Sequence, residues 1–235
     1  MKYPKVILSL GLPRSGSTWV YNVVQNILKL SNRPYSALFA DTLDALPEDK
    51  GQDHIFLVKS HTAEAPLREL AMKNELPIVI SLRDPRDALA SAITFTNAKF
   101  DVLLDLICSS VEAISRCLDY SGSMVLRYED NFTADIGTIE RLAAALGVSN
   151  DQVLFERIQG DLRADVVRSE IERLVAAGHF GENPNSSKFD PVSQWHPGHI
   201  ADGRIGKYRD MLTSDQIAAV HARLCHFMRS FYPES

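Results

Sequence analysis

The sequence has few cysteines and no long apolar run. Its three cysteines, Cys108, Cys117 and Cys225, follow no metal-binding spacing, and the first two fall inside a helical apolar pattern. This distribution favours buried, reduced thiols over a zinc site or a disulfide framework. The apolar runs are far shorter than the roughly 20 residues of a membrane span, and the first of them meets Pro13 and Arg14 too early for a signal peptide. We expect a cytoplasmic protein without a membrane span.

An excess of positive charge is also absent. With 25 Lys and Arg against 30 Asp and Glu, the 235-residue chain has a net charge of −5 at pH 7. No broad basic field is available to hold a nucleic acid, so local clusters of Arg and Lys are expected to bind particular small anions. Hydrophobic residues make up 45% and charged residues 23% of the chain, as in an ordinary globular domain, and no internal repeat divides it. We expect one domain over residues 1–235.

A Gly-rich loop follows the first apolar run. Residues 6–8, Val-Ile-Leu, precede residues 11–19, Gly-Leu-Pro-Arg-Ser-Gly-Ser-Thr-Trp, and apolar residues at helical spacing come next. A loop that joins a strand to a helix directs free backbone N–H groups and the positive end of the helix dipole at a bound anion. A turn without a ligand is the alternative. The anion site is favoured because polar side chains crowd this backbone: Arg14, Ser15, Ser17 and Thr18.

The loop lacks one residue of a nucleotide P-loop. Its frame, Gly-x4-Gly followed by Ser-Thr, has Ser17 where that motif has lysine, and Arg14 is its only cation. In nucleoside-triphosphate sites the lysine contacts the β and γ phosphates and the hydroxyl binds magnesium. The loss of the lysine argues against ordinary ATP or GTP hydrolysis and favours a different phosphate ligand.

Later apolar runs end in charged or aromatic residues. Residues 55–58, 78–82 and 124–126 are short, continuous runs of the kind found in strands buried on both faces of a parallel sheet. Helical stretches separate them, and ligands of such sheets bind beyond the carboxyl ends of the strands. The sequence therefore predicts an α/β fold: a three-layer domain with a central parallel sheet flanked by helices, similar to P-loop nucleotide-binding folds.

Several helix boundaries are also predicted. Asp84 is expected to cap a helix that Pro85 opens and that continues through Ser91, and Arg86 and Asp87 are interpreted as surface charges of this helix. Further helices are predicted over residues 102–118 and 136–146, with two more before residue 177 and a last one capped by Thr213. The polar segment 31–52 shows no period and is expected to hold turns and part of a substrate pocket. Residues 178–210 are expected to form a mobile loop over the active site, because they are rich in Gly, Asn, Ser and Pro.

Residues 13–19, Pro-Arg-Ser-Gly-Ser-Thr-Trp, resemble the 5′-phosphosulfate loop of sulfotransferases that use 3′-phosphoadenosine 5′-phosphosulfate (PAPS). Residues 58–61, Val-Lys-Ser-His, resemble the family's Lys-Thr-His segment. The pair Arg83 and Ser91 resembles its 3′-phosphate site, and residues 128–130, Tyr-Glu-Asp, match its adenosine contact. The resemblance implies transfer of a sulfuryl group from PAPS to a hydroxyl or amine of a small-molecule or carbohydrate acceptor. The product would be 3′-phosphoadenosine 5′-phosphate (PAP), and no metal is expected.

The resemblance assigns roles to individual residues. It implies that His61 is the general base and that Lys59 and Arg14 stabilise charge on the sulfuryl and leaving phosphate oxygens. A strand-end Arg and a helix hydroxyl two turns later also suit different oxygens of one phosphate. The implied cofactor-binding residues are Arg14, Ser15, Gly16, Ser17, Thr18, Trp19, Arg83, Ser91, Tyr128 and Arg204.

Some assignments stay open at this point. A carboxylate, Asp41 or Glu64, is the alternative base, and core packing is the alternative for Trp19. Residues 203–209 match the family's last segment only loosely, because Ala-Asp at 201–202 replaces its Arg-Lys. The last 3′-phosphate contact could then come from Arg204, from Lys207 or from neither.

Two further questions concern the histidine pair and the class of function. The sequence His196-Pro-Gly-His199 is interpreted as a turn, since it has no third metal ligand. A small-molecule kinase with a variant P-loop and a silent nucleotide-binding protein are the alternative functions. Neither the acceptor nor the oligomeric state follows from the sequence.

Overall fold

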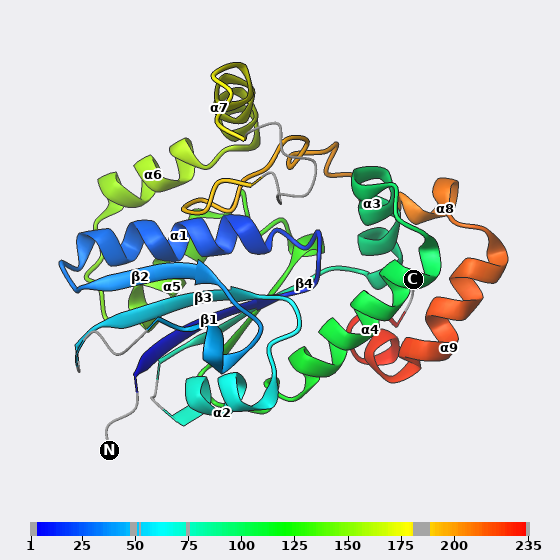
Figure 1. Ribbon diagram of the computed structural model, residues 1–235, viewed down its shortest axis with the longest axis horizontal. Coiled ribbons are helices and arrows are strands. Elements are labelled where there is room, and N and C mark those ends of the chain that lie inside the picture. Colours follow the sequence, from blue (N-terminus) through cyan, green and yellow to red (C-terminus); the bar gives the residue numbers. More distant parts are fainter. Residues whose placement is uncertain (1–3, 48–50, 52, 74–75, 181–188, 234–235) are drawn as a thin grey trace.

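The structure is a computed structural model that describes residues 4–47, 51, 53–73, 76–180 and 189–233. Five strands of these residues form one sheet in the order β2-β3-β1-β4-β5, with every neighbouring pair parallel (Figure 1). The strands are β1 (Lys5–Gly11), β2 (Tyr35–Phe39), β3 (Ile55–Ser60), β4 (Ile78–Leu82) and β5 (Ser123–Arg127). The predicted parallel α/β sheet is confirmed.

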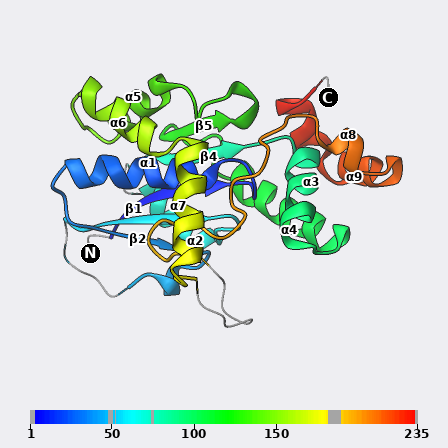
Figure 2. The same ribbon diagram turned by 90° about the horizontal axis from the view of Figure 1, so that it is seen from above.

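Helices cover both faces of the sheet. They are α1 (Ser17–Leu30), α2 (Ala65–Lys73), α3 (Pro85–Thr96), α4 (Phe100–Ser115), α5 (Ile136–Ala145), α6 (Gln152–Asp161), α7 (Ala164–Ala176), α8 (Tyr208–Met211) and α9 (Ser214–Phe231). Short 3-10 turns occur at Leu43–Ala45 and Tyr128–Asp130. Helices α3, α4, α8 and α9 gather at one end of the molecule (Figure 2). No helix in the described part of the chain is both long and apolar enough to cross a membrane.

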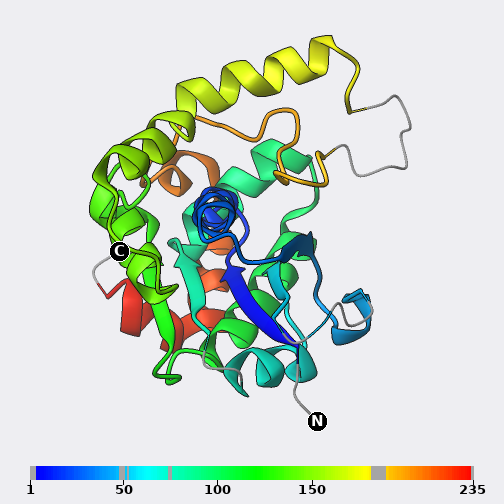
Figure 3. The same ribbon diagram turned by 90° about the vertical axis from the view of Figure 1, so that its left-hand side faces the viewer.

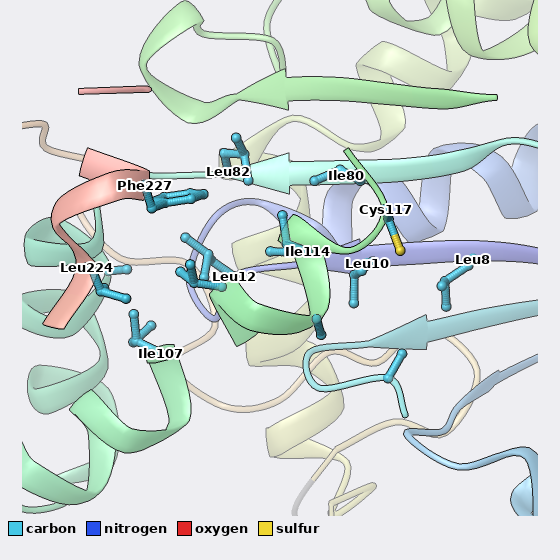
Figure 4. Close-up of a cluster of buried hydrophobic side chains, with 14 of the residues drawn as sticks. Leu8, Leu10, Leu12, Ile80, Leu82, Ile107, Ile114, Cys117, Leu224 and Phe227 are labelled. Carbon is cyan, nitrogen blue, oxygen red and sulfur yellow. The ribbon is translucent and has the colours of Figure 1, made fainter. Parts of the chain in front are cut away.

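Alternation along the strands produces two cores. Leu8 and Leu10 of β1 pack toward α4 and α9, while Ile7 faces the opposite core with α1 and α5. The first core is drawn in Figure 4, with side chains from β1, β4, α4 and α9 around the start of the Gly-rich loop. Full burial of each such side chain contributes about 1.5 to 3 kcal/mol. Packing on both faces therefore holds β1 in place, and with it the start of the Gly-rich loop.

The helix boundaries follow the predicted signals. Asp84 caps α3 by accepting a hydrogen bond from the Arg86 N–H at 2.9 Å. Thr213 caps α9 in a capping box with Gln216. The chain leaves α5 through Gly147, whose φ is 68°. Residues 189–206 contain no helix or strand, and the part of the predicted loop at 181–188 lies outside the described residues.

Some sequence interpretations were wrong. Residues 31–52 include an edge strand, β2, which alternation did not reveal because most of its residues are only half-buried. Arg86 and Asp87, interpreted as surface charges, are each about 1% exposed. Arg86 pairs with Asp84 at 2.5 Å, and Asp87 accepts hydrogen bonds from two backbone N–H groups of the segment 206–208. Cys108 and Cys225 are half-buried rather than buried.

Candidate active site

The Gly-rich loop lies at the carboxyl end of the central strand, between neighbours on both sides. β1 pairs with β3 on one side and β4 on the other, which is the position where open α/β sheets bind ligands. A Cβ at Gly11 would overlap the Ser81 hydroxyl of β4, so only glycine lets the loop pass this close. Gly16 has a φ of 81°, a conformation that glycine adopts without strain.

Ser15 shapes the loop from inside. Its N–H donates to the Leu12 carbonyl at 3.2 Å. Its hydroxyl is 2.7 Å from the same carbonyl and 2.8 Å from the Ser81 hydroxyl. Both donors of this fully buried residue are therefore engaged within the protein. A contact of the Ser15 side chain with a cofactor would require one of these hydrogen bonds to break.

The start of α1 has free hydrogen-bond donors. In the described residues, the N–H groups of Gly16, Ser17 and Thr18 meet no hydrogen-bond acceptor. The N-cap is a glycine without a capping side chain, and the first turn holds no acidic residue. Free donors and the helix dipole stabilise an anion at such a helix start.

Three cations surround this helix start without any carboxylate partner. Among the ion pairs of the described residues, none involves Arg14, Lys59 or Arg83. Lys59 and Arg83 are only 6% and 4% exposed. Burying a charge without a counter-ion is costly, so such groups are usually paired. In a chain of net charge −5, this concentration of unpaired positive charge indicates a site for an anionic ligand.

Lys59 contacts the loop from β3, and Arg14 belongs to the loop itself. The Lys59 ammonium, at the end of β3, donates to the Thr18 hydroxyl at 2.8 Å. Burial and the charge of Arg14 lower the pKa of Lys59 to about 8. Arg14 has a φ of 65°, a strained conformation for a non-glycine residue, and its side chain donates to Ser91 Oγ at 3.1 Å. Burial and Arg83 lower the pKa of Arg14 to about 10. A bound anion would relieve both desolvated charges.

Arg83 and Ser91 do come close to the same loop. Arg83, directly after β4, donates to the carbonyl of Arg14 at 3.0 Å and to that of Arg204 at 2.9 Å. Its guanidinium also lies 4.3 Å from the centre of the Tyr128 ring. Ser91 is connected to the same loop by the hydrogen bond that it accepts from Arg14. The structure therefore brings together five of the predicted cofactor residues, Arg204 among them through its backbone carbonyl.

His61 is held in one tautomer. Its Nδ1 lies 2.5 Å from the Gly11 carbonyl oxygen, which accepts hydrogen bonds only, so Nδ1 carries the proton. Nε2 is then unprotonated, as a general base requires. Burial and the charge of Lys59 lower the pKa of His61 to about 4. An anion bound beside Lys59 would raise it again.

The alternative bases differ in their surroundings. Asp41 Oδ1 accepts hydrogen bonds from Ser60 Oγ at 2.5 Å and from the N–H groups of His61 and Thr62 at 3.4 and 3.2 Å. This carboxylate thus supports the backbone that carries His61. Glu64 is exposed. The structure shows no comparable positioning for it.

Trp19 and Arg204 are less directly placed. The Trp19 ring packs 5.6 Å from that of Phe132, and its buried indole N–H has no partner in the described residues. The Arg204 guanidinium forms an ion pair with Asp210 at 2.7 Å, and Lys207 pairs with Asp202 at 3.3 Å. Either cation would have to leave its partner to contact a phosphate.

The sequence did not reveal every residue of the site. A cavity of about 200 Å³ lies between the loop, α3 and the segment 197–201. Phe95 lines it, with Arg14 4.7 Å from its ring centre. The available signal was its position four residues after Ser91, about one turn further along α3. His196-Pro-Gly-His199 forms the predicted turn, closed by a hydrogen bond from the His199 N–H to the His196 carbonyl at 3.0 Å.

Acid should destabilise the folded protein. Burial is the first cause of a lowered pKa at His61 and His196, to about 4 in each, and at His199, well below its usual range. The unfolded chain, with ordinary histidines near pKa 6.5, then binds more protons than the folded chain, so stability is lost as pH falls from about 6.5 toward 4. One histidine whose pKa falls from about 6.5 to about 4 on folding lowers the free energy of unfolding by about 2 kcal/mol at pH 5. Thermal unfolding at pH 7.5 and pH 5 should show a lower Tm in acid, and an unchanged Tm would contradict these lowered pKa values.

Comparison with known proteins identifies the family. A profile of the sulfotransferase domain matches residues 4–224, so the chain belongs to the sulfotransferase domain family. The resemblance in the Gly-rich loop is thereby confirmed. No curated protein sequence matches the chain.

Solved structures of the same fold include two proteins. Mouse sulfotransferase SULT7A1, in a complex with PAP, is 13% identical with a TM-score of 0.64, and the match covers 97% of this chain and 85% of that one. Retinol dehydratase with retinol and PAP is 15% identical with a TM-score of 0.66, covering 97% and 82%. Its complex with androsterone and PAP is 14% identical with a TM-score of 0.64, covering 98% and 83%. At these identities the likeness establishes the fold.

Proposed function

We propose that this sulfotransferase domain binds PAPS and transfers its sulfuryl group to a hydroxyl or amine acceptor, with His61 as the general base. The observation that carries the proposal is a set of three cations without carboxylate partners, the buried Lys59 and Arg83 and the half-buried Arg14, around the free N–H groups of the α1 start. The similar structures of mouse SULT7A1 and retinol dehydratase contain PAP, which supports the choice of nucleotide.

The arrangement suggests a division of work. The α1 start and Lys59 would hold the 5′-phosphosulfate, and Arg83 with Ser91 would hold the 3′-phosphate. The acceptor oxygen or nitrogen attacks sulfur in line, the bond from sulfur to the 5′-phosphate oxygen breaks, and the acceptor proton goes to His61 Nε2. Positioning and charge stabilisation supply most of the catalysis in such transfers. Lys59 and Arg14 stabilise the charge that builds on the sulfuryl and leaving phosphate oxygens.

A small molecule is the acceptor class that the comparisons support. Retinol and androsterone occupy the structures of retinol dehydratase, and each is a small molecule. In this chain the acceptor would approach His61 over the end of β2. Phe39, 40% exposed, lies there with its ring centre 5.8 Å from that of His61.

Calorimetry separates this function from that of a kinase. The full chain is titrated with PAP and with ADP, each with and without magnesium. We expect PAP to bind equally well in both conditions, because the described residues offer a site for two separate phosphates and no cluster of three metal-ligating side chains. Tighter binding of ADP than PAP, dependent on magnesium, would contradict the proposal.

Binding of PAP should also change the segment 189–206. Two carbonyls of this segment accept hydrogen bonds from the nucleotide-binding region: Asn22 donates to Ser193 O at 2.8 Å and Arg14 to His199 O at 3.2 Å. Figure 3 shows it running between α7 and α1. We propose that it orders further over bound nucleotide, since it has no regular structure of its own. Hydrogen exchange should slow there on adding PAP, and equal protection with and without PAP would contradict this.

A further inference from the structure

Two histidines of the segment 189–206 lie beside the proposed site of sulfuryl transfer. His199 Nδ1 is 2.7 Å from His196 Nε2. The His196 ring packs on that of Phe95, with ring centres 4.4 Å apart. The carbonyl of His199 accepts a hydrogen bond from Arg14. The pair is therefore fixed to the Gly-rich loop and to α3 at once.

Hydrogen bonding determines which nitrogen of the pair is free. His196 Nδ1 lies 3.4 Å from the carbonyl oxygen of Pro197, so this nitrogen carries a proton and His196 Nε2 accepts from the Nδ1–H of His199. The remaining nitrogen, His199 Nε2, is then unprotonated. A proton added there would break neither hydrogen bond and would turn the pair into a cation with one further N–H donor.

The charges that face the pair come from two other elements. Burial is the largest cause of the lowered pKa of His196 and of His199, and Arg14 of the Gly-rich loop and Lys59 of β3 lower both further. His196 and His61 act in the same direction on His199, and none of the leading causes of either shift is an acid. Without a bound anion the pair is therefore neutral at pH 7. A phosphate or sulfuryl group placed between Arg14 and Lys59 would reverse this field.

Among the described residues 189–207, no other group is free to add positive charge beside Arg14 and Lys59. Arg204 and Lys207 are held in ion pairs with Asp210 and Asp202. The positions 201–202 just before Gly203 hold Ala and Asp. The histidine pair is thus the only described group of residues 189–207 that lies near Arg14 and Lys59 and can gain positive charge.

We propose that His196 and His199 form a proton-loaded anion contact, which takes up one proton at His199 Nε2 when a nucleotide phosphate or phosphosulfate occupies the site. This inference rests on the proposed function for the identity of the ligand. The charged pair donates a hydrogen bond from His199 Nε2 to an oxygen of the anion. It also adds a positive charge that the site does not carry without the anion. Binding is therefore coupled to proton uptake, and affinity rises as pH falls toward the range where the pair is loaded.

Calorimetry with PAP measures this proton directly. The full chain is titrated at pH 7 in two buffers of different ionisation enthalpy, and the difference in heat gives the number of protons taken up. The variants are His199→Asn, whose amide N–H replaces the Nδ1 donor to His196, and His61→Asn. His226→Gln, an exposed histidine on α9, is the matched control. Any change in the protonation of PAP on binding contributes equally in all four proteins.

We expect the wild type, His61→Asn and the control to take up about one proton more than His199→Asn. One linked proton changes affinity by at most about tenfold per pH unit. The Kd of His199→Asn should therefore be about tenfold weaker than wild type at pH 6.5 and close to it at pH 8.5. Equal uptake in His199→Asn and wild type, or its loss only in His61→Asn, would overturn this inference while PAP binding stands. A wild type that does not bind PAP would instead overturn the proposed function, and this inference with it.

Discussion

Replacing His61 with alanine is expected to lower turnover by about 10² to 10⁴-fold, the usual loss on removing a general base. Affinity for PAP should stay close to wild type, because the phosphates are held by other groups. The reason lies in the hydrogen bond from His61 Nδ1 to the Gly11 carbonyl, which leaves Nε2 free to take the acceptor proton. Turnover is measured as release of PAP from PAPS with an acceptor that the wild type accepts.

A second substitution separates catalysis from support of the loop. His61→Asn keeps an amide N–H in the place of Nδ1 and can still hold the Gly11 carbonyl, but it has no base. It should be as slow as His61→Ala, whereas His226→Ala should match the wild type. Wild-type turnover in His61→Ala would shift the role to a carboxylate such as Asp41 or Glu64. Recovery in His61→Asn would show that His61 only positions the loop.

Replacing Arg83 with alanine is expected to weaken PAP strongly and AMP hardly at all. Removing one partner of a desolvated charged pair typically costs about 2 to 5 kcal/mol, which is about 30-fold to several thousand-fold in Kd. AMP lacks the 3′-phosphate and should bind through the α1 start and Lys59 alone. Side-by-side titrations of both nucleotides give the ratio of the two effects.

The ratio matters because Arg83 also supports the protein. It donates to the carbonyls of Arg14 and Arg204, so its loss could loosen the loop as a whole. Arg229→Ala, an exposed arginine on α9, serves as the control and should change neither Kd. If Arg83→Ala weakens PAP and AMP by the same factor, Arg83 supports the fold or the shared 5′ site, and the assignment of the 3′-phosphate is wrong.

The sequence predicted the parts of the fold that depend on local patterns. The runs that became β1, β3 and β4 are continuous and apolar, because strands buried on both faces require it. The run that became β5 was interpreted in the same way, but β5 is an edge strand and its Val125 is 38% exposed. The other edge strand, β2, was missed because Ser36 interrupts its apolar residues. Helix caps such as Asp84 and Thr213 were predicted because one side chain and its own backbone determine them.

The site was predictable where residues follow strand ends and not where they depend on distant packing. Lys59 and Arg83 were found because the ends of parallel strands meet at one edge. Arg86 and Asp87 were misinterpreted, since only the tertiary structure shows that the segment 206–208 covers them. For the same reason the proximity of His199 to Arg14 and Lys59, across a long loop, had no signal in the sequence.

A crystal structure of the chain with PAP tests the central proposal most directly. The account predicts the 5′-phosphate on the N–H groups of residues 16–18, within hydrogen-bond distance of Lys59, and the 3′-phosphate between Arg83 and Ser91. His61 Nε2 should face the side of the 5′-phosphate where the sulfuryl group would be. A 5′-phosphate bound away from the α1 start, or a 3′-phosphate without contact to Arg83, would contradict the account.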